Sequence, residues 1–218
     1  MRYELINVDL PFLAGSAFFL ALVLWSGEVS RAEGALCLCG FGLYRWYALA
    51  RQPPAAGEHD AHERELAREP RWLRSSLVLL VCAGLIYLGA DWTVRAVIEL
   101  AGLLEIGAEV IAASAVALGT SLPEVAVTIT AARRGRPELA IGNVLGSNVF
   151  NAFAVTGTSA LVGPLLVPDS LLAFAVPLMV IATLLGFFMI MEKEMTKWEG
   201  WLLFLFYVFF LGTLFNLL

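Results

Sequence analysis

Long apolar stretches alternate with short polar turns along the chain, and seven of them predict helices that cross a membrane. A membrane-spanning helix needs about 17–25 mostly apolar residues. The stretches near this length are residues 9–26, 34–50, 75–103, 108–132, 138–162, 170–191 and 199–217. The pattern therefore predicts an all-α fold: a polytopic membrane helix bundle with about seven transmembrane helices.

One longer polar segment, residues 51–73, interrupts this pattern. It holds paired prolines, mixed charges and both histidines of the chain. We interpret it as a solvated linker between residues 1–50 and residues 74–218. A regulatory metal site built from His59, Asp60 and His62 is the alternative interpretation of the same segment.

Composition narrows the class of protein. Hydrophobic residues make up 60% of the chain and charged residues 15%, whereas a soluble globular domain has about 45–50% and about 25%. The net charge of -5 argues against binding to nucleic acid, which requires a basic surface. The three cysteines lie in apolar segments and form neither a disulfide framework nor a zinc pattern.

The basic residues predict the orientation in the membrane. With seven spans, twelve of the fourteen Lys and Arg residues fall on the side that holds the start of the chain and the 51–73 linker. Cytoplasmic loops carry the excess of Lys and Arg. We therefore expect the linker to be cytoplasmic and the C-terminus to be outside.

The first two spans resemble the last two at a constant offset of 166 residues. The paired positions are Pro11 and Pro177, Ser30 and Thr196, and Glu33-Gly34 and Glu199-Gly200. Since five spans follow the linker, the repeat unit has five helices and the chain opens with only the last two of a first unit. An odd unit gives inverted copies, as in many secondary transporters. We expect three further helices ahead of Met1, the counterparts of residues 75–162.

The fourth span contains the run Ala117-Leu-Gly-Thr-Ser-Leu-Pro-Glu124, which is unusual for a helix that only fills space. Pro123 has no N–H and its ring clashes with the carbonyl of Gly119. Glu124 places a carboxylate at membrane depth, at a cost of about 2.5–3.5 kcal/mol on insertion scales. We expect a broken helix here, whose carbonyls, hydroxyls and carboxylate suit a hard cation such as Na⁺ or Ca²⁺.

The fifth span carries a matching run at residues 142–151, Gly-Asn-Val-Leu-Gly-Ser-Asn-Val-Phe-Asn. Asn143, Ser147 and Asn151 are four residues apart and are expected on one helical face. Gly142 and Gly146 would let another helix approach closely. Uncharged amides and hydroxyls offer oxygen ligands without further negative charge.

These two motifs together resemble the second alpha-repeat of the calcium/cation antiporter superfamily, the sodium/calcium exchangers. The likeness extends to Gly89-Ala90-Asp91 and to the two Glu-Gly turns. It implies ten helices in two inverted halves, with ions bound where four central helices meet. It also implies that the spans equivalent to residues 75–103 slide to open each side in turn, and the short linker fits a transporter of a prokaryotic inner membrane.

The resemblance also implies the site residues. Glu124 would be the carboxylate that Ca²⁺ and Na⁺ share, and Asn151 the ligand that faces it. The other implied oxygen ligands are the hydroxyls of Ser121, Ser147 and Thr120 and the carbonyl of Ala117. No cofactor is expected besides the transported ions.

The expected function is antiport of Ca²⁺ against Na⁺ by alternating access at a shared site in the middle of the membrane. The alternatives are exchange of Ca²⁺ for H⁺ or a K⁺-dependent exchange, although Asn151 disfavours the K⁺-dependent form. An intramembrane hydrolase is a poor fit, because both histidines lie in the linker and the spans hold no Ser–Lys pair. We therefore expect no enzyme.

The chain has one Glu124 and one Asn151, whereas the family site needs a second pair of ligands from the first repeat. This conflicts with a complete exchanger. The interpretations left open are that the chain is a fragment or its start is misplaced, that a separate protein supplies the missing helices, or that two copies form a homodimer, which the one-sided distribution of Lys and Arg opposes. An alternative expectation for the function is therefore an inactive partial chain that needs those helices.

Asp91 and Glu99 remain open, because Asp91 either orients the ion-binding helices or pairs with Arg95. Glu138, after Pro137, is expected to stabilise a helix start.

Overall fold

The computed structural model describes residues 8–50, 72–105, 107–169, 171–192 and 196–215. The described residues are almost entirely helical. They divide into a larger unit, Met1–Arg51 with Leu122–Leu218, and a smaller unit, Gln52–Ser121. Each unit is described by itself.

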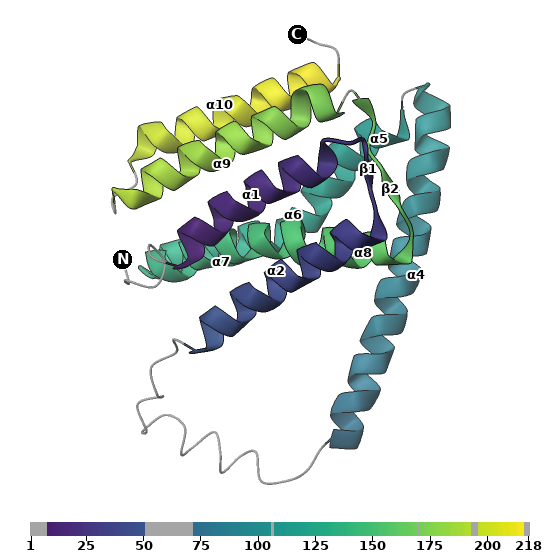
Figure 1. Cartoon of the computed structure of the whole chain (residues 1–218), viewed down its shortest axis with the longest axis horizontal. Coiled ribbons are helices and arrows are strands. Elements are labelled where there is room, and N and C mark those ends of the chain that lie inside the picture. The colour runs from purple at the N-terminus through teal and green to yellow at the C-terminus, as the bar shows by residue number, and fades with distance from the viewer. Residues whose placement is uncertain (1–7, 51–71, 106, 170, 193–195, 216–218) are drawn as a thin grey trace. The chain divides into compact units, whose positions relative to one another are not determined.

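The larger unit consists of helices and one pair of very short strands (Figure 1). Its elements are α1 (Leu10–Leu24), β1 (Glu28–Val29), α2 (Arg31–Ala50), the greater part of α6 (Ala117–Arg133), α7 (Pro137–Val149), η3 (Phe150–Val155), α8 (Thr156–Val162), β2 (Leu165–Leu166), η4 (Leu171–Ala175), α9 (Val176–Met191) and α10 (Lys197–Leu214). The smaller unit holds α4 (Trp72–Leu104), α5 (Ala108–Ile111), η2 (Ala112–Val116) and the first residues of α6. The elements η2, η3 and η4 are π-helical.

Each of the seven predicted spans coincides with a helical stretch. Four stretches in the described part of the chain are long and apolar enough to cross a membrane: Ala112–Arg133, Pro137–Val162, Leu171–Met191 and Lys197–Leu214. Most of the predicted linker lies outside the described residues. Helix α4 begins at Trp72, and the boundary between the linker and residues 74–218 stays a prediction.

Helices α2 and α8 approach each other unusually closely in the larger unit. A Cβ atom built on Gly34 would lie 2.7 Å from Cβ of Ala160 and 3.0 Å from the carbonyl oxygen of Gly157. A Cβ on Gly157 would lie 2.8 Å from the carbonyl oxygen of Gly34. Helices in a membrane associate mainly by such close packing of small residues, because lipid chains are as apolar as the side chains. The two glycines therefore fix how α2 sits on α8.

A cluster of buried side chains lies next to this contact. Helices α1, α2, α7 and α9 and the π-helical η3 all contribute to it. Its members are Leu10, Leu13, Cys37, Leu145, Val149, Phe153 and Ile190. Helix α1 packs on α9 as well as on α7, and it lies between these two later helices (Figure 1).

The two turns that the sequence pairs at an offset of 166 residues have the same local structure. The backbone N–H and the hydroxyl of Ser30 donate to the Glu33 carboxylate over 2.8 and 2.7 Å. The same groups of Thr196 donate to Glu199 over 2.5 and 2.8 Å. Both arrangements are capping boxes, which satisfy the free N–H groups at a helix start.

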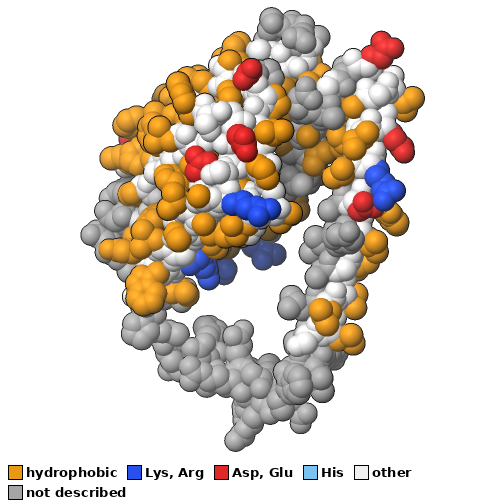
Figure 2. Space-filling view, turned by 45° about the vertical axis from the view of Figure 1, so that its right-hand side comes forward, with side chains coloured by type: hydrophobic (Ala, Val, Ile, Leu, Met, Phe, Trp, Pro, Cys, Tyr) orange, Lys and Arg blue, Asp and Glu red, His pale blue; other side chains and the backbone are white. Residues whose placement is uncertain are grey.

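Outside the cluster, large apolar side chains face outward. Trp25 is 83% exposed and Leu22 is 73% exposed. Figure 2 shows hydrophobic side chains spread over the visible face, with few charged groups among them. Such a surface is unfavourable in water and suits the interior of a bilayer.

The short strands β1 and β2 were not expected from the sequence. They pair antiparallel, with Glu28 opposite Leu166 and Val29 opposite Leu165. Each strand has two residues, which is too short to show the alternating pattern by which strands are recognised. The pairing ties the loop after α1 to the loop after α8.

Candidate functional site

Glu124 is the one acidic residue among the predicted ligands, and it lies on α6 one position after Pro123. Its side chain is half-buried. The oxygen Oε2 is buried and has no hydrogen-bond partner in the described part of the chain. Buried polar atoms in proteins are nearly always paired, so an unpaired carboxylate oxygen indicates a missing partner such as a cation.

Asn143 joins α7 to α6 next to this carboxylate. Its Nδ2 donates to the backbone carbonyl of Glu124 and to Oγ1 of Thr128, each over 3.1 Å. The described hydrogen bonds thus link Glu124 to Asn143, the first member of the predicted amide face.

The other polar groups of α7 bond to their own helix. Ser147 donates from Oγ to the carbonyl of Val144 over 3.1 Å, and Asn148 donates to the same carbonyl over 2.8 Å. A serine hydroxyl that donates one hydrogen bond keeps two lone pairs, which can coordinate a cation or accept a further hydrogen bond. Ser147 is therefore compatible with its predicted role as an oxygen ligand.

Asn151 lies in the π-helical η3 and is exposed. Its backbone carbonyl accepts a hydrogen bond from Oγ1 of Thr156 over 3.3 Å. The change from α to π geometry after Val149 alters the spacing of four on which a common face with Asn143 and Ser147 was predicted. The role of Asn151 as the ligand facing Glu124 stays a prediction.

Ala117, Thr120 and Ser121 belong to the smaller unit, at the start of α6. The hydroxyl of Thr120 donates to the Ala117 carbonyl over 3.0 Å, and Ser121 is exposed. The predicted carbonyl ligand of Ala117 therefore already accepts one bond. Thr120 and Thr93 both line a hollow of about 400 Å³ between residues of α4, α5, η2 and α6.

The expected break in the helix at residues 119–123 is wrong. Helix α6 continues through Pro123 to Arg133, and the irregular backbone comes earlier, in the π-helical η2 at Ala112–Val116. Proline is tolerated in membrane helices where local adjustments and hydroxyl groups satisfy the backbone around it. π-Helical turns occur often at functional sites, and here one precedes the first motif and one begins at the end of the second.

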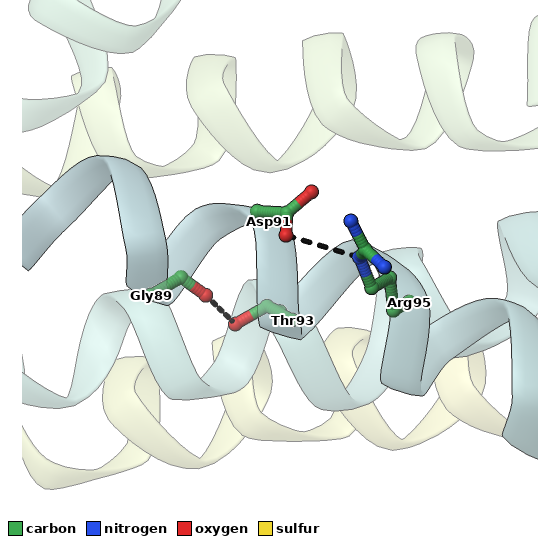
Figure 3. Close-up of polar contacts among 4 residues, drawn as sticks. All are labelled: Gly89, Asp91, Thr93 and Arg95. Carbon is green, nitrogen blue, oxygen red and sulfur yellow. Dashed lines mark hydrogen bonds and ion pairs between the residues drawn. The ribbon is translucent and has the colours of Figure 1, made fainter.

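Asp91 forms an ion pair with Arg95 on α4, with 3.0 Å between Oδ2 and Nε (Figure 3). The hydroxyl of Thr93 donates to the carbonyl of Gly89 in the same turn over 2.7 Å. The structure thus has the Asp91–Arg95 pair, one of the two roles considered for Asp91. Glu138 lies in the first turn of α7 after Pro137, as expected for a helix start.

The described residues contain no group of three or more His, Cys, Asp or Glu side chains that is able to hold a metal ion. The site on α6 and α7 therefore offers one carboxylate among neutral oxygen atoms. The alternative metal site of His59, Asp60 and His62 lies outside the described residues. Cys37, Cys39 and Cys82 are all free thiols.

Sequence reasoning missed two polar contacts near α7. Thr128 accepts from Asn143, and Tyr44 on α2 donates to Asp9 over 3.1 Å. A Cβ built on Gly146 would lie 3.9 Å from the Tyr44 hydroxyl, so this pair borders the second motif. Neither contact has a local sequence signal, because the partners are 15 and 35 residues apart.

Comparison with known proteins identifies related chains. The family model described as "Sodium/calcium exchanger protein" matches residues 74–216. The sodium/calcium exchanger MaX1 of Methanosarcina acetivorans is 44% identical over 139 residues, which are 63% of this chain and 39% of that protein. The putative antiporter CaxA of Alkalimonas amylolytica is 36% identical over 128 residues, 59% of this chain and 40% of that protein.

A solved structure shares the fold. It is the sodium–calcium exchanger NCX_Mj soaked with Na⁺ and Sr²⁺, with a TM-score of 0.63 and 24% sequence identity. The match covers 96% of this chain and 65% of the solved chain. The chain described here thus spans about two fifths of the length of the two curated relatives in their aligned regions and about two thirds of the solved exchanger.

Proposed function

The chain belongs to the sodium/calcium exchanger family, and we propose that it forms part of a secondary transporter that exchanges Ca²⁺ for Na⁺. The family consists of membrane transporters and not of enzymes. The chain is an integral membrane protein, given its family and its four helices of spanning length and composition. The exchanged ions, the mechanism and the partners are what we propose.

One observation carries the proposal, namely the buried and unpaired Oε2 of Glu124. A carboxylate at membrane depth is costly unless a cation or a hydrogen-bond donor accompanies it. Calcium prefers oxygen ligands from carboxylates, carbonyls and amides, and Glu124, Ser147 and Asn151 lie on the α6 and α7–η3 segments that supply such atoms. This supports Glu124 as the carboxylate that the transported cations share.

Exchange then follows from charge. A site with few carboxylates neutralises only a limited positive charge, so Ca²⁺ and a set of Na⁺ ions compete for the same oxygens. Binding of one ion species favours release of the other. We propose Thr120, Ser121 and the Ala117 carbonyl as further oxygen ligands from the start of α6.

We further propose that three helices of the first repeat complete the site, in the same chain or in another. The support is the offset of 166 residues, at which both capping boxes recur. These helices would supply the second pair of ligands. The 51–73 linker is proposed to face the cytoplasm and the C-terminus the outside, because of the distribution of Lys and Arg.

The test is calcium-45 flux into vesicles that contain the chain together with the completing helices. Uptake is expected to require an opposing Na⁺ gradient and to stop when choline replaces Na⁺. Glu124→Gln is expected to abolish uptake, while the matched variant Glu138→Gln leaves it intact.

Each alternative outcome has a definite reading. Uptake that follows a pH gradient and ignores Na⁺ replaces the Na⁺ coupling with H⁺ coupling, and uptake that needs K⁺ indicates the K⁺-dependent form. Undiminished uptake in Glu124→Gln removes Glu124 from the mechanism and contradicts the proposal.

A further inference from the structure

The side-chain amide of Asn143 binds α6 at two points. Its Nδ2 lies 3.1 Å from the Glu124 carbonyl and 3.1 Å from Oγ1 of Thr128. An asparagine amide nitrogen carries two hydrogens, so one group can serve both acceptors at once. The carbonyl of residue 124 points along α6 toward residue 128, so the two acceptors lie next to each other where α6 faces Asn143 of α7.

Two bonds constrain more than one bond does. A single hydrogen bond from α7 would let α6 rotate or slide about the shared atom. Bonds from one amide to a backbone carbonyl and to a side-chain hydroxyl of α6 restrict both the sliding and the rotation of α6 against α7. The first of them is made to the backbone of Glu124 itself, the residue whose Oε2 is buried without a partner.

The neighbouring asparagine shows the contrast. Asn148 donates its amide to Val144 of its own helix over 2.8 Å and is exposed. It therefore has the same chemical group on the same helix without a described contact to α6. Asn143, by comparison, is half-buried and reaches across to the neighbouring helix.

We propose that Asn143 and Thr128 are positioning residues, which hold the Glu124 carboxylate in its buried place and thereby set the affinity for the cation. The inference rests on the proposed function, in which Glu124 binds the cation. Neither residue needs to touch the ion. Loss of the bridge lets α6 move, so that binding must first restore the position of the carboxylate.

The test is calcium-45 binding, in lipid nanodiscs, to the chain assembled with the completing helices. Asn143→Ala is expected to raise the Ca²⁺ concentration for half-saturation by about tenfold, since two hydrogen bonds are lost. Thr128→Val keeps the shape and loses one acceptor, and about a threefold rise is expected. Thr128→Ser restores the oxygen atom and is expected to bind as the unaltered chain does.

The double variant separates positioning from general damage. Because both residues act through one bridge, Thr128→Val is expected to add nothing in the Asn143→Ala background. Asn148→Ala and Thr130→Val make the same chemical changes at exposed positions and are expected to shift half-saturation by less than about twofold. Equal effects of Asn143→Ala and Asn148→Ala, or additive effects in the double variant, would overturn the proposal.

Glu124→Gln, measured alongside, keeps the two ideas apart. If this variant binds Ca²⁺ as well as the unaltered chain, the proposed function fails. If it loses binding while Asn143→Ala does not, only the positioning role fails.

A second measurement needs no bound ion. In the nitrogen-15 NMR spectrum, Thr128→Val is expected to shift the side-chain amide signal of Asn143 and leave that of Asn148 in place. An unmoved Asn143 signal would contradict the bridge itself.

Discussion

The starts of α2 and α10 have the same sequence signature and the same capping box, yet they differ in what covers them. At the start of α2, Gly34 lies so close to α8 that a Cβ would come 2.7 Å from Ala160. At the start of α10, no atom of the described chain lies within 4 Å of a Cβ built on Gly200. A cap is encoded in four consecutive residues, whereas the helix contact beside it depends on a distant segment.

This difference has a structural meaning within the repeat. In the proposed arrangement, α2 belongs to the first repeat, and it packs on α8, which belongs to the second repeat. If the two repeats are equivalent, α10 of the second repeat is expected to pack on the helix of the first repeat that corresponds to α8. We therefore expect Gly200 to contact one of the proposed completing helices in the assembled transporter, just as Gly34 contacts α8.

The largest expected effect comes from filling the covered glycine. Gly34→Leu places a branched side chain against Ala160 and the Gly157 carbonyl, with no room for it. Overpacking of this kind costs about 3 kcal/mol. Thermal unfolding in detergent micelles, followed by tryptophan fluorescence, measures the loss of stability.

Gly200→Leu is the matched control for that variant. It is expected to change the stability of the chain by less than about 0.5 kcal/mol, because it meets no described atom. A loss as large as that of Gly34→Leu would show that the two starts do not differ as described.

A smaller effect is expected from the other side of the close contact. Gly157→Ala brings a methyl group within 2.8 Å of the Gly34 carbonyl and 2.9 Å of Cγ of Leu38. The expected cost is about 1–2 kcal/mol. The same unfolding measurement checks it, with Gly186→Ala as the control, since a Cβ there meets no described atom within 4 Å.

The two caps are expected to be equal, in contrast to the two glycines. Ser30→Ala and Thr196→Ala each remove the hydroxyl of a capping box, and each is expected to cost about 1 kcal/mol. Chemical unfolding of both variants under identical conditions measures the two losses. If one of the two variants loses no stability, the two turns are alike in structure but differ in what their caps contribute to stability.

The smallest effect is a dependence on pH at the α2 cap. The backbone N–H and hydroxyl of Ser30 lower the pKa of the Glu33 carboxyl, in the turn before the apolar stretch, from its ordinary value of 4.5. The ionised form therefore stabilises the folded state above that value, and this contribution is lost as the pH falls from 4.5 through the lowered pKa. Unfolding midpoints at decreasing pH are expected to fall more for the unaltered chain than for Glu33→Gln.

The helices were predictable from the sequence because their signals are local. Runs of apolar residues placed all seven helical stretches, and the offset of 166 residues predicted that Ser30 and Thr196 begin equivalent helices. The predicted break at Gly119–Pro123 was wrong. The N–H that Pro123 lacks does not end a helix where other groups can satisfy the backbone around it. The π-helical segments and the pairing of Glu28 with Leu166 have no comparable local signal.

The contacts around Glu124 in the candidate site could be predicted only in part, for the same reason. Glu124 stands out because a carboxylate at membrane depth is rare, and Asn143 because it lies in an unusually polar run. Thr128 did not stand out, since a threonine in a helix is ordinary until the structure sets it beside Asn143. Contacts between distant segments follow from packing, and the sequence pattern alone does not contain them.

The account depends most directly on Glu124 as a cation ligand. The decisive measurement is equilibrium binding of calcium-45 to the chain assembled with the completing helices and to its Glu124→Gln and Glu138→Gln variants in the same assembly, each with and without excess Na⁺. We predict that Na⁺ displaces Ca²⁺ from the unaltered chain and from Glu138→Gln, and that Glu124→Gln binds no Ca²⁺ above background. Calcium binding that survives in Glu124→Gln at full strength would contradict the account.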